Sequence, residues 1–365
     1  MWVLVLAARG LVLLLGAASV WLALGSSIRT VILPRAVPSR LTRTVFLSVR
    51  AVYELRIGRG ASYERRDQVM ASIGPYSLIL LLVVWLGFIL AGFTGIFWAL
   101  GHTLFDGFQL SVSSIVTLGF ATPRDVSTTV AVLVESLLGL VELALLITYL
   151  PSMYGAFQRR EALVTMLEVR AGSPPSGVEM LKRFNRLNRL ERLSGEVWEQ
   201  WEAWFVDVEE AHTSLPALNF FRSPQPHRSW LTASGAVLDA ASLYASTLEG
   251  EHDVRADLCI RAGYLALRQI SKSFGLSFDA NPGPSAPISI ARAEFDAAYQ
   301  ELRTAGLPVR EDADAAWRDF AGWRVNYDEV LVGLAAVVSA PYAPWSSDRG
   351  AVRRRPSPIR AMLGL

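Results

Sequence analysis

The chain has 365 residues, of which 52% are hydrophobic and 19% charged, and its mean hydropathy is +0.32. This hydropathy is high for a soluble protein of this size and indicates a membrane protein. The formal net charge of +2 indicates no class of partner, and the single cysteine, Cys259, excludes an intramolecular disulfide and fits a reducing cytoplasm.

Three segments are long and apolar enough to cross a membrane: residues 10–28, 76–100 and 128–150. About 20 residues at a rise of 1.5 Å cross a hydrocarbon core roughly 30 Å thick. We assign residues 1–34 to a first membrane helix and residues 76–158 to a module that holds the other two. The sequence therefore predicts an all-α membrane protein.

Arginine predicts the orientation, because positively charged loops stay in the cytoplasm. The linker at residues 35–75 is rich in arginine, and Arg159 and Arg160 follow the third segment. The second segment therefore leaves the cytoplasm and the third returns to it. Alternatively, the first segment is a cleaved signal peptide, which would invert this orientation. Within the linker, residues 41–57 have an amphipathic helical pattern that predicts either an interfacial helix on anionic lipid or a solvated linker helix.

Residues 104–123 lie between the second and third segments and are too polar to span a bilayer. We expect a short helix that dips into the membrane, followed by irregular backbone that returns to the same side. Irregular backbone at membrane depth is tolerated only where protein buries it or where it lines a water-filled cavity. This arrangement predicts an ion channel.

The sequence Ser-Ile-Val-Thr-Leu-Gly-Phe-Ala-Thr-Pro at residues 114–123 resembles the pore helix and filter of the potassium-channel pore superfamily, whose filter is usually written Thr-Val-Gly-Tyr-Gly. The resemblance covers residues 76–158. It implies a backbone-carbonyl filter for K⁺, without any cofactor, formed by Thr117, Leu118, Gly119, Phe120 and Ala121. One chain holds one such strand and a ring needs four, so we expect a homotetramer.

Ala121 departs from the family, which has a second glycine there followed by an aspartate. A residue with a Cβ pays about 1–2 kcal/mol to adopt the left-handed conformation. Either the outer filter is rearranged or the alanine is strained. A relaxed cation filter and a vestigial pore both stay open at this point.

Glu135 and Glu142 are seven residues apart and share a face of the third segment, with Gly139 between them. Acids inside a membrane usually face the bundle interior or a wet cavity. We interpret both acids as candidates to line the permeation path. Alternatively, one of them pairs with another helix or is protonated. Gly139 is a candidate hinge or a packing position.

Residues 159–345 have helical patterns interrupted by Pro and Gly at 172–177 and 282–287, which predicts an all-helical cytoplasmic domain. Trp198, Trp201 and Trp204 repeat at three-residue steps, and we interpret them as a buried helix face. The four histidines have no metal-site spacing, and no catalytic or nucleotide-binding motif is visible. Residues 346–365 predict a disordered basic tail, which either touches anionic lipid or is solvated.

These patterns together predict a potassium-channel-like tetramer in the plasma membrane that is not an enzyme. Its expected partners are other copies of the chain and membrane lipid, with no nucleic acid, no metal site and an unknown ligand for the cytoplasmic domain. The alternative is a membrane-anchored scaffold or signalling protein whose pore loop does not conduct.

Overall fold

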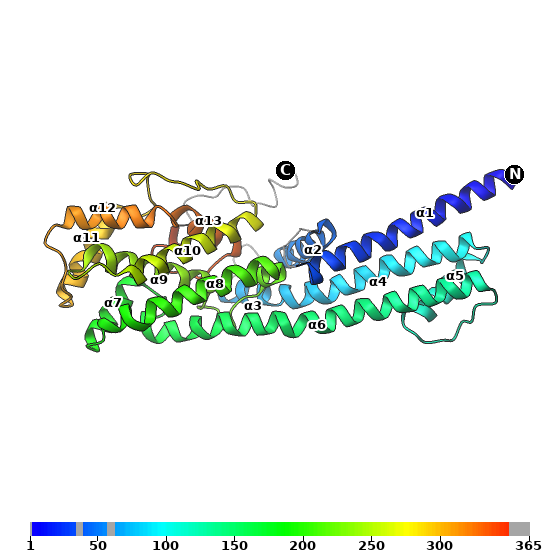
Figure 1. Cartoon of the computed structure of the whole chain (residues 1–365), viewed down its shortest axis with the longest axis horizontal. Coiled ribbons are helices and arrows are strands. Elements are labelled where there is room, and N and C mark those ends of the chain that lie inside the picture. The colour runs from blue at the N-terminus through cyan, green and yellow to red at the C-terminus, as the bar shows by residue number, and fades with distance from the viewer. Residues whose placement is uncertain (1, 34–38, 57–62, 350–365) are drawn as a thin grey trace. The chain divides into compact units, whose positions relative to one another are not determined.

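The computed structural model describes residues 2–33, 39–56 and 63–349, and Figure 1 shows the order of its helices. This described part is helical, with one isolated bridge between Leu248 and Val309 and no strand. It divides into two compact units. The first contains α1, α2, α4, α5 and the beginning of α6. The second contains α3, α6 from Ala156 onward, and all later elements.

The first unit holds the helices that the apolar segments predict. They are α1 (Trp2–Ser27), α4 (Ile73–Ala99) and the part of α6 (Val126–Ala171) that ends at Gly155, and α1 continues as the π-helical η1 (Ile28–Ile32). Within the described residues, three helical stretches are long and apolar enough to cross a membrane. Between α4 and α6 lies the short helix α5 (Leu104–Ile115). For the described residues, the predictions of an all-helical fold and of three helices long and apolar enough to cross a membrane are therefore confirmed.

Two glycines let α1 and α4 pack closely. A Cβ on Gly16 would lie 2.5 Å from the carbonyl oxygen of Gly92, and one on Gly92 would lie 2.7 Å from that of Gly16. Small residues are the usual means of close helix packing in membranes. The pair is also joined by polar contacts, since Trp85 Nε1 donates to Ser26 Oγ at 3.0 Å and Ser19 Oγ donates to the carbonyl of Phe88 at 2.8 Å.

The amphipathic pattern in the linker forms α2 (Arg40–Arg56). Val45, Phe46 and Val49 are buried, and the helix packs on α4. The hydroxyl oxygens of Thr42 and of Thr30 in η1 form a hydrogen bond of 2.7 Å. The buried apolar residues of α2 thus pack against other helices of the first unit. Residues 1 and 34 of the predicted first membrane helix, residues 35–38 and 57–62 of the predicted linker, and residues 350–365 of the predicted tail lie outside the described part.

The second unit is a helical domain built around α9 (Trp230–Thr247), which is buried along most of its length. Helices α8 (Trp198–Ser214) and α10 (Val254–Ser273) pack on each other, and α9 contacts α7, α10 and α12. Trp198, Trp201 and Trp204 are all buried, which confirms the interpretation of the tryptophan repeat as a core face. The other elements of this unit are α3 (Tyr63–Ala71), α7 (Gly177–Arg186), η2 (Leu193–Val197), η3 (Pro216–Phe220), α11 (Arg292–Thr304), α12 (Ala313–Arg324), α13 (Asp328–Val338) and η4 (Ser347–Arg349).

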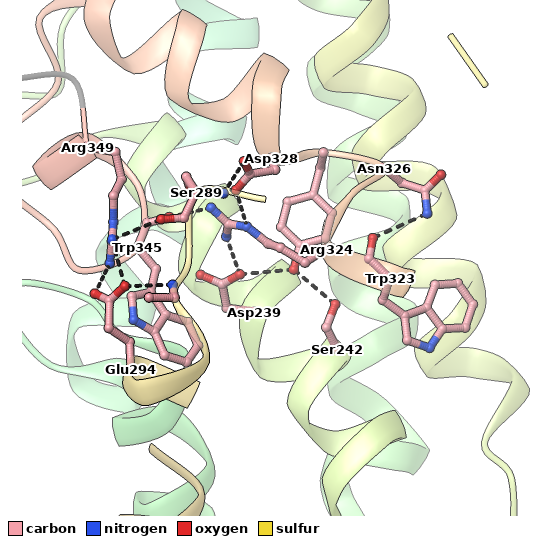
Figure 2. A network of polar contacts seen from close by, with 12 residues as sticks. Asp239, Ser242, Ser289, Glu294, Trp323, Arg324, Asn326, Asp328, Trp345 and Arg349 are labelled. Atoms are coloured by element: carbon pink, nitrogen blue, oxygen red, sulfur yellow. Dashed lines mark hydrogen bonds and ion pairs between the residues drawn. The ribbon is translucent and has the colours of Figure 1, made fainter. Parts of the chain in front are cut away.

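A buried ionic network joins α9, α12 and α13 (Figure 2). Arg324 is fully buried and donates to Asp239 at 2.5 Å, to Asp328 at 2.8 Å and to the carbonyl of Trp345. Burial alone would lower the pKa of Arg324, but the two carboxylates outweigh it and raise that pKa above its ordinary value. Arg324 therefore stays charged and ties the segment after α13 to the core.

Candidate functional site

The candidate site is the first-unit segment that begins with α5 and ends at the start of α6. Thr103 caps α5, because its hydroxyl oxygen accepts from the backbone N–H of Asp106 at 3.1 Å. Gly107 faces α4 closely, since a Cβ there would lie 3.1 Å from the carbonyl oxygen of Thr94. The hydroxyl of Ser111 is 3.1 Å from the carbonyl oxygen of Leu90 in α4. The first half of the segment is thus a short helix fixed against α4.

After α5 the backbone is irregular over residues 116–125, which we call the α5–α6 loop. Ser113 holds this loop against the last turn of α5. Its carbonyl oxygen accepts from the backbone N–H of Leu118 at 2.9 Å and of Gly119 at 3.4 Å, and its hydroxyl accepts from that of Ala121 at 3.0 Å. One serine therefore sets the path of the chain from residue 118 to residue 121.

Two residues of the loop have positive φ: Thr117 at 54° and Gly119 at 71°. The expected left-handed conformation of Gly119 is present, and it is cheap because glycine has no Cβ. Ala121 does not have positive φ. We expected either a strained Ala121 or a rearranged outer filter, and the backbone strain at Ala121 is not present. The other expected outcome, a rearranged outer filter, stays a prediction.

The loop leaves consecutive carbonyl groups without donors. Among the hydrogen bonds of the described residues, none ends on the backbone oxygen of Thr117, Leu118, Gly119 or Phe120. The side chains of Leu118 and Phe120 are 63% and 58% exposed in the single chain. Carbonyl groups without donors would be unfavourable at membrane depth unless protein or water covers them, whereas lipid can cover exposed apolar side chains.

The loop ends at Asp125, which caps α6 by accepting from the backbone N–H of Thr128 at 2.9 Å. Hydrogen bonds from the Ser127 hydroxyl and from Thr128 hold the pKa of Asp125 well below its usual range. The hydroxyl of Thr128 donates to Asp125 at 2.7 Å and accepts from His102 Nε2 at 2.8 Å. His102 precedes α5, so this cluster connects the two ends of the segment.

Glu135 and Glu142 are both fully buried within the single chain. Glu135 accepts from the hydroxyl of Ser111 in α5, and Glu142 accepts from that of Ser27 in α1 at 2.7 Å. Each carboxyl has one oxygen without a hydrogen-bond partner in the described part of the chain. Each acid therefore contacts another helix, which the alternative expected of only one of them, and the lining of a permeation path stays a prediction.

Gly139 lies where α6 crosses the end of α5. A Cβ at this position would clash with the carbonyl oxygen of Ile115. The residue is therefore required for close approach of the two helices, which favours the packing role among its two predicted roles. The structure brings Gly139 and Glu135 against α5, whereas Glu142 lies against α1.

Sequence reasoning missed Ser27, Ser111 and Ser113, which position the acids and the loop. Serine is common in membrane helices, and its partners are set by helices distant in sequence. The one signal in the sequence was three serines at 111, 113 and 114 in an otherwise apolar run. Within the described residues, no group of three or more His, Cys, Asp or Glu side chains could hold a metal ion.

Comparison of the chain with models of protein families, with curated proteins and with solved structures finds no match.

Proposed function

We propose that this chain is the subunit of a potassium-channel-like cation channel, in which four copies place their α5–α6 loops around one axis. The observation that carries the proposal is the run of backbone oxygens at residues 117–120 that accept no hydrogen bond among the described residues. This run follows a short helix and lies between two helices long enough to cross a membrane.

The chemistry of cation permeation accounts for such a run. A cation that leaves water must replace its hydration shell with other oxygens, and rings of backbone carbonyls can supply them. Each chain would offer the oxygens of Thr117, Leu118, Gly119 and Phe120. The hydroxyl of Thr117, which donates to the carbonyl of Val116 at 2.8 Å, would complete the innermost site. The C-terminal end of α5 carries about half a negative charge and would favour a cation near it.

The exposed apolar side chains support assembly. In the single chain, Leu118 and Phe120 of the loop are exposed, as are Leu104, Phe105 and Phe108 of α5. Lipid covers such residues on the outside of a membrane protein, but irregular backbone beside them has to be covered by protein or water. A closed ring of four chains would cover the loop and leave its carbonyl oxygens facing the axis.

The same proposal assigns the chain to a plasma membrane, with the arginine-rich linker and the second unit in the cytoplasm. The close packing of α1 on α4 through Gly16 and Gly92 supports a retained membrane helix at the N-terminus. Ala121 has no left-handed strain, so the proposal includes an outer filter that is rearranged relative to the family pattern. We propose K⁺ as the main permeant ion.

A flux assay tests conduction. Purified protein in liposomes should allow K⁺ efflux down its gradient, and Gly119→Val should abolish it because valine is disfavoured at the positive φ of this position. Gly87→Val is the matched control, because Gly87 lies in α4 and a Cβ there meets nothing within 4 Å. Flux in neither the wild type nor the control, from protein shown to be tetrameric by native mass spectrometry, would contradict the channel and favour a membrane-anchored scaffold.

A further inference from the structure

The second unit contains a basic cavity that no part of the proposed channel uses. It has a volume of about 450 Å³ and lies between the end of α6 and the segment from α7 to η2. Five arginines line it, together with one acid, Glu196. The arginines are Arg170, Arg183, Arg186, Arg189 and Arg192. The volume is within the range of about 300–1,000 Å³ typical of small-molecule sites.

Most of this positive charge is not neutralised by the residues that the structure describes. Glu179 pairs with Arg183 at 2.7 Å and lies 3.8 Å from Arg186. Arg170 donates to the neutral amide of Gln200 at 3.1 Å. The described residues provide no ion pair or hydrogen bond for the side chains of Arg189 and Arg192.

The fold brings these like charges together at a sharp change of direction. Helix α7 buries Met180, Leu181 and Phe184, so its arginines lie on other faces. Asn188, with φ of 50°, turns the chain after α7. The backbone N–H of Arg192 then donates to the carbonyl of Arg189 at 3.0 Å, which places the two arginines on one tight turn.

The cavity also has an apolar part. Phe184 and Val197 are buried in its wall, whereas Leu187 and Val169 line it with side chains that are 69% and 78% exposed. Guanidinium groups bind phosphate through paired N–H donors. A site with unpaired guanidinium groups beside apolar side chains suits a ligand that carries phosphate next to an apolar or aromatic group.

We propose that this cavity binds a phosphate-bearing ligand of that kind, with Arg189 and Arg192 as its main phosphate contacts. The shared chemistry is a phosphate group joined to an apolar moiety, as in a nucleotide or the headgroup region of an anionic phospholipid. The inference does not depend on ion conduction, because every residue in it belongs to the second unit.

Isothermal titration calorimetry of the full chain in a neutral detergent tests the proposal. The probes are inorganic pyrophosphate, ATP, dioctanoyl phosphatidylglycerol and dioctanoyl phosphatidylcholine. The test variant is Arg189→Gln with Arg192→Gln. The control is Arg261→Gln with Arg303→Gln, which removes the same charge from two exposed arginines of the second unit that lie outside the cavity.

We expect saturable binding of ATP or of phosphatidylglycerol, reduced at least about tenfold in the test variant because two charge-assisted contacts are lost, and unchanged in the control. Binding of ATP alone identifies a soluble nucleotide as the source of the phosphate, and binding of phosphatidylglycerol alone identifies a lipid. The proposal is overturned if the wild type binds neither ATP nor phosphatidylglycerol. It is also overturned if the test and control variants bind these probes equally well. Thermal melting of both variants verifies that they are folded.

Discussion

His212 is a buried residue whose partners fix its protonation state. Its Nδ1 is 2.6 Å from Asn219 Oδ1 and donates to it. Its Nε2 is 3.2 Å from Arg160 Nη1 and accepts from it, while Glu161 pairs with the same guanidinium at 2.7 Å. Burial, and then the charge of Arg160, lower the pKa of His212 to about 3, against a smaller opposing effect of Asn219.

This pKa predicts how stability depends on pH. Between its ordinary value of 6.5 and about 3, the unfolded chain binds a proton at this histidine that the folded chain does not. The free energy of unfolding should therefore fall as pH falls, by about 1.4 kcal/mol between roughly pH 7.5 and pH 5.5. In His212→Gln this contribution should disappear. Urea unfolding followed by tryptophan fluorescence measures it, and equal pH slopes in the two proteins would contradict the assignment.

Arg324 and Arg318 lie on the same helix, α12, but only Arg324 is buried. Arg324→Gln leaves Asp239 and Asp328 without their cation and should lower the free energy of unfolding by about 3–5 kcal/mol. Arg318→Gln on the exposed face should change it by less than about 0.5 kcal/mol. Thermal or urea unfolding of the two variants checks this difference, and similar values for both would show that the network does not stabilise the second unit.

The sequence could not distinguish these two arginines. Both stand in the same amphipathic pattern, and the burial of Arg324 depends on Asp239, which is 85 positions away. By contrast, the φ of Gly119 could be predicted, because glycine occupies a position where the resemblance requires a left-handed backbone. The backbone conformation of a single residue was therefore predictable, whereas the contacts between side chains distant in sequence were not.

At the scale of elements, the contact between α1 and α4 depends on two glycines. Gly92→Leu would force the helices apart, because even a Cβ there meets the Gly16 carbonyl. We expect overpacking to lower the stability of the protein in detergent by about 1–3 kcal/mol or more. Gly87→Leu on the same helix is the control, since its Cβ position is open. Thermal melting distinguishes the variants, and equal melting temperatures would refute the close crossing.

The α5–α6 loop should respond to Ser113→Ala without loss of the fold. The substitution removes the hydroxyl that accepts from Ala121 but keeps the backbone contacts to Leu118 and Gly119. In the proposed channel, the outer part of the filter would loosen and the preference for K⁺ over Na⁺ would fall. Bi-ionic reversal potentials measure this change.

Ser152→Ala is the control for that experiment, because Ser152 is exposed on α6 and its hydroxyl donates to the carbonyl of Thr148 at 3.2 Å. An unchanged reversal potential in Ser113→Ala would indicate that this serine does not shape the filter. A change in both variants would indicate a general effect of serine loss.

Hydropathy located the three long helices, and α5 could be predicted because residues 104–123 lie between two of them and are too polar to span a bilayer. The packing of α2 on α4 and the grouping of α3 with the second unit could not be predicted. A period of 3.6 residues identifies the apolar face of a helix but does not identify the helix that covers it.

At the scale of the whole molecule, the two units differ in composition and in the roles that we propose for them. The first holds helices long and apolar enough to cross a membrane and the α5–α6 loop, whose carbonyl oxygens at residues 117–120 accept no hydrogen bond from the described residues. The second holds a helical domain with a hydrophobic core, a buried ionic network and a basic cavity. We propose that the first conducts and the second binds a phosphate-bearing ligand.

The most direct test of conduction is the single-channel current of the purified protein in a planar bilayer under opposed gradients of K⁺ and Na⁺. A K⁺ filter in the α5–α6 loop predicts discrete openings with a reversal potential near the K⁺ equilibrium value, and loss of the openings in Gly119→Val but not in Gly87→Val. A silent bilayer with verified tetramers, or currents that both variants leave unchanged, would contradict a filter at residues 117–121.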